Sequence, residues 1–299
     1  MTATPGSRPM AQARSPERKV PTRRMDFEES FEDVPRHFTK DGDLVTSHVV
    51  AALSSLFPDG EDFFVRSVRH YRDRITEPEL KRQVAGFIGQ EAVHGREHRV
   101  FNDRLAEVGY PTKAYERLTK RTLAIRERLL PASSNLAATA ALEHFTATLA
   151  ELVLSSEEIR DALGHQAVRD LFVWHALEES EHKAVAFDVY RAAGGTERMR
   201  VWTMRFFRVV FVVAMVLQVT GSLLLDKATY NPRTLVRSFR NLRHSPVVSP
   251  EIWRQLRDYD RPDFHPDDRD TGALIEQWRT ELFGPEGSLN DKLAKAGAA

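Results

Sequence analysis

The sequence contains no cysteine, which excludes disulfide bonds, thiol catalysis, zinc–thiolate sites and iron–sulfur clusters. It also lacks an excess of charge of either sign, because 43 lysines and arginines balance 43 aspartates and glutamates. No excess of positive charge favours the binding of nucleic acid, so we expect no nucleic-acid partner. Any metal that this chain binds must therefore be held by histidines and carboxylates.

Strand patterns are scarce as well. Apolar residues three and four apart recur along most of the 299-residue chain, as amphipathic helices require. The sequence predicts an all-α protein. Residues 1–24 are rich in proline, serine, arginine and threonine and lack the apolar run of a secretory signal, so we expect a disordered arm and a cytoplasmic location.

The helical pattern divides the remaining chain into three parts. We expect a bundle over residues 40–195, an apolar helix within 196–229 and a C-terminal extension of short helices over 230–299. In the first bundle helix, Asp59 should cap the second half. The predicted helices of the bundle, including a crossover helix at 112–130, cover residues 44–74, 77–108, 112–130, 133–154 and 163–193.

Two Glu-x-x-His motifs, Glu91 to His94 and Glu179 to His182, lie on different predicted helices. Because residues three apart share one helix face, each motif can hold a metal ion. A single Glu-x-x-His motif usually lies on a solvent-exposed helix face, but each motif here follows a further glutamate on another helix. These two glutamates are Glu61, with Asp62 as the alternative, and Glu143, with Glu151 as the alternative.

The resulting order is Glu, Glu-x-x-His, Glu, Glu-x-x-His, which is the arrangement by which ferritin-like carboxylate proteins hold two metals. Four carboxylates converging inside a bundle would repel one another, and two divalent cations would neutralise them. Carboxylate oxygens with imidazole nitrogens suit iron, with manganese as the second choice. The sequence therefore predicts a ferritin-like four-helix bundle with a two-iron site.

Three more histidines lie near this constellation. At about 100° per residue, His98 falls about 20° from Glu91 and His175 about 40° from Glu179 on their helices. We expect His175 to be a third nitrogen ligand, with a hydrogen bond to a carboxylate as the alternative. His98 and His144 are expected behind the ligands, as hydrogen-bond partners.

Several of these residues carry a resemblance to known families. Phe57-Pro58-Asp59-Gly60-Glu61, Gln90-Glu91-x-x-His94, Glu143-His144-Phe145 and Trp174-His175-x-x-x-Glu179-x-x-His182-Lys183 resemble the bacterial family of predicted metal-dependent hydrolases of ferritin-like fold, over residues 40–270. The run from His175 to His182 also resembles the seven-ligand site of di-iron arylamine N-oxygenases, which implies that His175 is a ligand.

This second resemblance implies an enzyme that activates O2 at two irons, with electrons from a donor, and oxidises or oxygenates an organic substrate. No general base or oxyanion stabiliser is evident outside the ligand set, which favours this redox function. The alternative is a metal-dependent hydrolase that uses a water molecule bridging the two metals. Iron binding or storage is a minor alternative.

The apolar segment from Val209 to Leu225 is slightly shorter than the roughly twenty residues of a membrane span. Basic residues flank it on both sides, so it indicates no clear orientation. We expect either a buried helix, on the bundle or at a homodimer interface, or a helix associated with the cytoplasmic side of a membrane, with a true span as the third alternative. In the first two cases it could wall a channel for a small apolar or lipid-like substrate.

Overall fold

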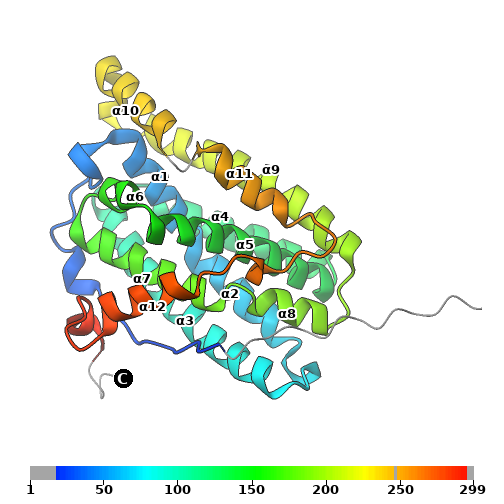
Figure 1. Cartoon of the computed structure of the whole chain (residues 1–299). Coiled ribbons are helices and arrows are strands. Elements are labelled where there is room, and N and C mark those ends of the chain that lie inside the picture. The colour runs from blue at the N-terminus through cyan, green and yellow to red at the C-terminus, as the bar shows by residue number, and fades with distance from the viewer. Residues whose placement is uncertain (1–17, 246–247, 295–299) are drawn as a thin grey trace, which may run out of the picture.

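The computed structural model describes residues 18–245 and 248–294. This part of the chain is helical and contains no strand, only an isolated bridge between Met25 and Leu293, which confirms the prediction of an all-α protein (Figure 1). Its α-helices are α1 (Leu44–Ser54), α2 (Phe57–Arg69), α3 (Pro78–Glu107), α4 (Thr112–Leu129), α5 (Ala132–Ser155), α6 (Glu157–Ala162), α7 (Gln166–His182), α8 (Val185–Ala192), α9 (Glu197–Leu224), α10 (Pro232–His244), α11 (Pro250–Asp258) and α12 (Gly272–Phe283).

Short 3₁₀ helices connect or extend several of these elements. They are η1 (Glu28–Phe31), η2 (Lys40–Gly42), η3 (Arg72–Arg74), η4 (Lys227–Tyr230), η6 (Pro266–Asp268) and η7 (Asn290–Lys292).

Helix α3 has the bounds that the sequence indicates. The Glu77 side chain accepts the backbone N–H groups of Glu79 and Leu80, and Pro78 occupies the first turn, where its missing N–H is not needed. The helix ends before Gly109, whose φ of 98° is a conformation that favours glycine. These local signals are strong enough to define the longest helix of the described chain.

The expected helix at 44–74 is instead two helices and a 3₁₀ turn. Ser55 and Leu56 keep right-handed helical backbone angles, and the main chain itself supplies the bond from the Gly60 N–H to the Leu56 carbonyl (3.1 Å). Helix α2 therefore begins at Phe57 without a side-chain cap. The prediction that Asp59 caps this helix is wrong, because Asp59 lies inside the first turn, where the helix dipole favours an acid.

The expected helix at 163–193 is also interrupted. Helix α7 ends at His182, a turn covers Lys183 and Ala184, and α8 continues the path to Ala192. The Lys183 ammonium donates to the carbonyl of Arg269 (2.6 Å) and to the hydroxyl of Thr271 (3.0 Å). The break therefore coincides with contacts to the C-terminal extension, which a reading of local helix signals does not include.

Helices α2 and α3 pack closely together, and α5 packs against α7, α8 and α9. Two apolar clusters form the core along these helices. On α3, Phe87 belongs to one cluster and Phe101 to the other; on α5, the same holds for Leu136 and Leu154. The segments of α3, α5 and α7 between these clusters carry buried acids and histidines, so a polar layer lies between two apolar layers.

The N-terminal segment from residue 18 to 25 lies on α3. A Cβ atom at Gly86 would be 2.2 Å from the Val20 carbonyl oxygen, and one at Gly89 would be 2.1 Å from the Thr22 hydroxyl. Only glycine therefore lets this segment approach the helix so closely. The expected disordered arm over residues 1–24 is too long, because residues 18–24 are packed here, while residues 1–17 lie outside the described residues.

Candidate metal centre

The structure brings all seven predicted ligands into the polar layer. Helix α2 supplies Glu61, α3 supplies Glu91 and His94, α5 supplies Glu143, and α7 supplies the other three. Each residue is buried, with an exposed fraction of 4% or less. The seven residues of this central cluster are Glu61, Glu91, His94, Glu143, His175, Glu179 and His182.

Close approach of α2 to α3 brings Glu61 into the cluster. A Cβ atom at Gly95 would lie 3.3 Å from Glu61 Oε2 and 3.5 Å from the Pro58 carbonyl oxygen. The first distance is tighter than most Cβ contacts, whereas the second is ordinary van der Waals contact. Gly95 therefore gives Glu61, from the shortest of the contributing helices, slightly more room beside α3.

The inward nitrogens of the histidines lie near several carboxylates. His182 Nε2 is 3.0 Å from Glu91, 3.4 Å from Glu143 and 3.5 Å from Glu179. His175 Nε2 is 2.9 Å from the same Glu179 oxygen. Glu179 thus lies between the two histidines.

Three further contacts complete the cluster. His94 Nδ1 is 3.6 Å from Glu179 and 3.9 Å from Glu91. His175 Nε2 is 3.6 Å from Glu61. Every predicted ligand therefore faces at least one other across the interior of the helices.

The outward nitrogens are held by groups outside the cluster, and these groups assign the proton of each imidazole. Gln90 donates its amide to the Pro21 carbonyl (3.0 Å) and to Glu181 (2.8 Å), so its oxygen must accept from His182 Nδ1 (2.9 Å). The His182 proton is therefore on the outward nitrogen. In the neutral ring, Nε2 then carries a lone pair that faces the carboxylates.

A longer chain of hydrogen bonds assigns His175 in the same way. Asn102 Oδ1 can only accept, so the Ser54 hydroxyl donates to it (2.7 Å) and accepts from His98 Nδ1 (2.9 Å). His98 Nε2 must then accept from His175 Nδ1 (2.6 Å). In the neutral ring with its proton on Nδ1, the inward Nε2 of His175 carries a lone pair; when Nε2 carries a proton, it donates to Glu179 at 2.9 Å.

His94 follows the same pattern. Its Nε2 is hydrogen-bonded to Glu178 (3.0 Å), and Arg23 donates to the other oxygen of Glu178 (2.8 Å). Burial outweighs Arg23 and raises the pKa of Glu178 to about 7, so above that pH Glu178 is a carboxylate and His94 Nε2 is the donor. The inward Nδ1 of His94 has no hydrogen-bond partner among the described residues. When the three rings are neutral with their protons on the outward nitrogens, three lone pairs thus face four carboxylates.

Unpartnered buried atoms are concentrated in this cluster. Both oxygens of Glu61, Glu91 and Glu143 lack a hydrogen bond within the described chain, as do one oxygen of Glu179 and the inward nitrogen of His182. Buried polar atoms are normally satisfied, because an unsatisfied one costs roughly 1–3 kcal/mol. An arrangement of acceptors without donors fits a site for cations.

The pKa values show the cost of this arrangement without cations. Burial, followed by the neighbouring carboxylates, raises the pKa of Glu61 and Glu91 well above their ordinary value. Burial and Glu179 raise the pKa of Glu143 to about 7. Burial opposes the charge on His182, but Glu179, Glu143 and Glu91 together outweigh it and raise the pKa of the imidazole well above its usual range. Protons thus compensate the charge where no cation does.

Sequence reasoning missed two members of the surrounding network, Gln90 and Glu178. Each lies one position before the glutamate of a Glu-x-x-His motif, and each binds the histidine of the opposite motif. The position directly before each motif is a signal that sequence analysis could have used. That each of these residues bonds to the motif on the other helix, α3 or α7, is not visible in the sequence. Such partners fix the ring orientation of metal-binding histidines.

The other two expected neighbours differ in outcome. His98 contacts His175, as expected of a residue behind a ligand. His144 does not reach the central cluster. It faces α11, where its Nε2 donates to the Gln255 carbonyl (3.0 Å), because one residue after Glu143 the helix has turned by about 100°.

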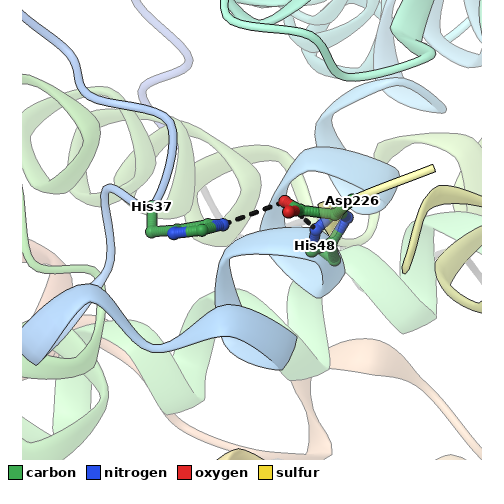
Figure 2. Close-up of side chains that lie close together, drawn as sticks. All are labelled: His37, His48 and Asp226. Atoms are coloured by element: carbon green, nitrogen blue, oxygen red, sulfur yellow. Dashed lines mark hydrogen bonds and ion pairs between the residues drawn. The ribbon is translucent and has the colours of Figure 1, made fainter. Parts of the chain in front are cut away.

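A second group of histidines and an acid lies under the end of α9 (Figure 2). Asp226 Oδ2 is 2.9 Å from His37 Nε2 and 3.2 Å from His48 Nε2, and these three residues form what we call the Asp226 cluster. Arg36 Nε donates to the same oxygen at 2.8 Å, and the Ala228 N–H donates to the other. Burial opposes ionisation of Asp226, but these donors lower its pKa well below the ordinary range. A guanidinium therefore already supplies the positive charge here.

A model of the family described as predicted metal-dependent hydrolase matches residues 21–270. No curated protein and no solved structure matches the chain. The family match corrects the expected reaction: O2 activation by a di-iron oxygenase is wrong, and the hydrolase that the sequence offered as the alternative agrees with it. The O2 and electron donor required by the redox prediction are withdrawn with it.

Proposed function

Because the chain belongs to the family of predicted metal-dependent hydrolases, we propose that its central cluster binds two divalent metal ions and that the protein hydrolyses its substrate there. One observation carries the assignment to this cluster. The outward hydrogen bonds of three histidines orient the rings so that, in their neutral form, three lone pairs face four carboxylates in a buried site. Two divalent ions would bring the charge of these four carboxylates to zero.

Three groups in the cluster each offer three ligand atoms within 4.8 Å of one another: Glu61, His94 and His175; Glu91, His94 and Glu179; and Glu91, Glu143 and His182. The first and the last share no residue, and each of them would hold one ion. Glu179 lies 2.9 Å from His175 and 3.5 Å from His182, so it would contribute to holding both. The donor set of oxygens and imidazoles suits iron, with manganese second.

A pair of divalent ions provides a nucleophilic water near neutral pH and stabilises the negative charge that develops during hydrolysis. The protein residues orient and enclose this site. Gln90, Glu178 and His98 hold the three imidazoles, and burial excludes bulk water. The rings of Phe57, Phe87 and Trp174 lie 4.6, 5.0 and 4.9 Å from ligand histidines. These rings pack against the histidines and make the surroundings of the cluster apolar, and we propose an apolar or lipid-like ester as the substrate class.

We also propose that α2, α3, α5 and α7 form a bundle of the ferritin-like type. The order of the acids and Glu-x-x-His motifs along these helices supports it. Helices α2 and α3 pack together, as do α5 and α7, and both pairs are joined by α2–α5 and α3–α7 packing.

The test begins with metal analysis of the purified protein, which should contain about two metal ions per chain. The protein is then stripped with a chelator and assayed under anaerobic conditions on a short-chain nitrophenyl ester, a long-chain one and a nitrophenyl phosphodiester. We expect chelation to abolish turnover and iron or manganese to restore it, with the long-chain ester preferred. Absence of metal, or hydrolysis that chelation leaves unchanged, would overturn the proposal.

A further inference from the structure

Helix α9 exposes a long apolar face. Among the described residues it is the one helix long and apolar enough to cross a membrane by length and composition, yet only 22% of its most apolar stretch is buried. The exposed fractions reach 62% at Trp202, 64% at Val209 and 67% at Leu217. The apolar face defined by these positions is formed by Trp202, Phe206, Val209, Val213, Val216 and Leu217.

The opposite face of α9 is anchored to the protein. Arg200, Met204 and Phe207 are buried near its beginning, and Ser222 is buried near its end. The helix packs on α5 and α1, and Ser222 shares a hydrogen bond with His48 (2.6 Å). A helix held along one side by the protein lies on a membrane rather than crossing it.

Unpaired positive charge is concentrated on the helix that follows α9. On α9 itself, Arg200 is paired with Glu197, and Arg205 and Arg208 are paired with Asp260. Helix α10, which follows α9 along the same edge of the molecule, contains no acid (Figure 1). It packs Leu235 and Leu242 toward α1.

The outer side of α10 is basic and apolar. Four arginines are exposed and make no ion pair within the described chain, next to the exposed Val236 (58%) and Phe239 (50%). Unpaired arginines beside exposed apolar groups are typical of helices that bind anionic lipid surfaces. These arginines are Arg233, Arg237, Arg240 and Arg243.

We propose that the α9–α10 edge, comprising the apolar face of α9 and the exposed arginines and apolar residues of α10, binds the surface of a membrane that contains anionic lipids. The apolar side chains enter the boundary between head groups and acyl chains, and the arginines contact the lipid phosphates. A second copy of this chain fits less well, because pairing two α10 helices would bring four more unpaired arginines to a helix that contains no acid. This inference does not depend on the hydrolase proposal.

The experiment uses the full chain and vesicles of phosphatidylcholine, either alone or with about one third phosphatidylserine. We expect cosedimentation with the anionic vesicles and little with the neutral ones. Replacing three arginines by R233Q, R237Q and R240Q should weaken binding about a hundredfold, since each arginine contributes about fivefold. The matched control, R69Q with R72Q and K81Q, removes three exposed charges and should bind normally. These residues belong to the segment from the end of α2 to the beginning of α3, which lies away from α10 in Figure 1.

Two further measurements make the test independent of any single variant. Brominated lipid should quench the fluorescence of Trp202 in the unmodified protein, and W202F should lose this response. V209S with V213S and V216S should reduce binding to anionic vesicles at least tenfold with unchanged thermal unfolding. Failure of the unmodified protein to bind anionic vesicles, or an equal loss in the control, would overturn the proposal. A solution dimer that this valine variant dissociates, without vesicle binding, would assign the edge to a second copy instead.

Discussion

The central cluster and the Asp226 cluster both bring histidines to carboxylates in the interior, but they are compensated differently. In the Asp226 cluster, one carboxylate receives bonds from two histidines, an arginine and a backbone N–H. In the central cluster, four carboxylates and three histidines face one another while seven of the eight carboxylate oxygens lack a hydrogen bond within the described chain. Both clusters place acids beside imidazoles. Only the central cluster leaves carboxylate oxygens without a hydrogen-bond partner in the described chain.

This difference separates a structural anchor from a candidate metal centre. A guanidinium beside Asp226 would repel a cation, and its bonds join the N-terminal segment, α1 and the end of α9. No arginine or lysine is paired with any of the four acids in the central cluster among the described residues. The nearest cation, Arg23, is bonded to Glu178 and Glu181 behind the histidines.

The largest expected contrast comes from removing two residues from each cluster. E179A with H182A should lose both metal ions and essentially all hydrolysis, because the carboxylate proposed to contribute to holding both ions and one imidazole are gone. H48A with D226A should keep about two ions per chain. Elemental analysis after desalting measures both. Equal loss of metal from the two variants would remove the distinction between the clusters.

A second contrast concerns pH. The raised pKa of Glu143, about 7, means that the folded metal-free protein holds this proton more tightly than the unfolded chain. Its contribution to stability is present below the ordinary pKa of a carboxyl group and is lost as pH rises to about 7. E143Q removes the titrating group and with it this loss. As pH rises from about 5 to about 8, the free energy of unfolding of the metal-free variant should therefore increase by about 3 kcal/mol relative to that of the unmodified protein.

For D226N, the difference in unfolding free energy from the unmodified protein should show no such trend with pH. The pKa of Asp226 is lowered, so its contribution is complete above its ordinary value and is lost only in stronger acid. Urea unfolding of metal-free protein across this pH range measures both variants. If the difference in unfolding free energy between E143Q and the unmodified protein does not change with pH, burial and Glu179 do not raise the pKa of Glu143.

A smaller effect is expected from the groups behind the ligands. Q90L and H98L should each weaken metal binding about 10- to 100-fold, because they release the rings of His182 and His175. H144L is the matched control: His144 is adjacent to Glu143 in sequence but bonds to Gln255, so metal affinity should be unchanged. Competition with a chelator of known affinity measures the three variants, and a weakened control would contradict the assigned orientations.

The smallest effect is expected from H48L in the Asp226 cluster. It removes the bonds to Ser222 and Asp226 and should lower the free energy of unfolding by about 1–2 kcal/mol. The loss should be the same with metal and without it, because this cluster is complete without a cation. Thermal unfolding of both forms measures it, and a metal-dependent loss would indicate that the two clusters are linked.

Much of the fold and of the candidate site could be predicted because the signals are local. The bounds of α3 and α5 follow from Glu77, Pro78 and Pro131, and the spacing of three residues places each Glu beside its His. The break after His182 could not be predicted, since it accompanies contacts between Lys183 and residues almost ninety positions later. The Asp226 cluster escaped prediction for the same reason, because its members are separated by up to 189 positions.

By itself the sequence determined the helical class, the family resemblance and the identity of the acids and histidines in the central cluster, because helix periodicity and short motifs act within a few residues. Only the tertiary structure decided which ring nitrogens face inward, that Gln90 and Glu178 serve the opposite motifs, and that α9 keeps an apolar face uncovered. These features depend on which surfaces of distant helices meet. The packing of the whole chain determines which surfaces meet, and no local sequence pattern indicates it.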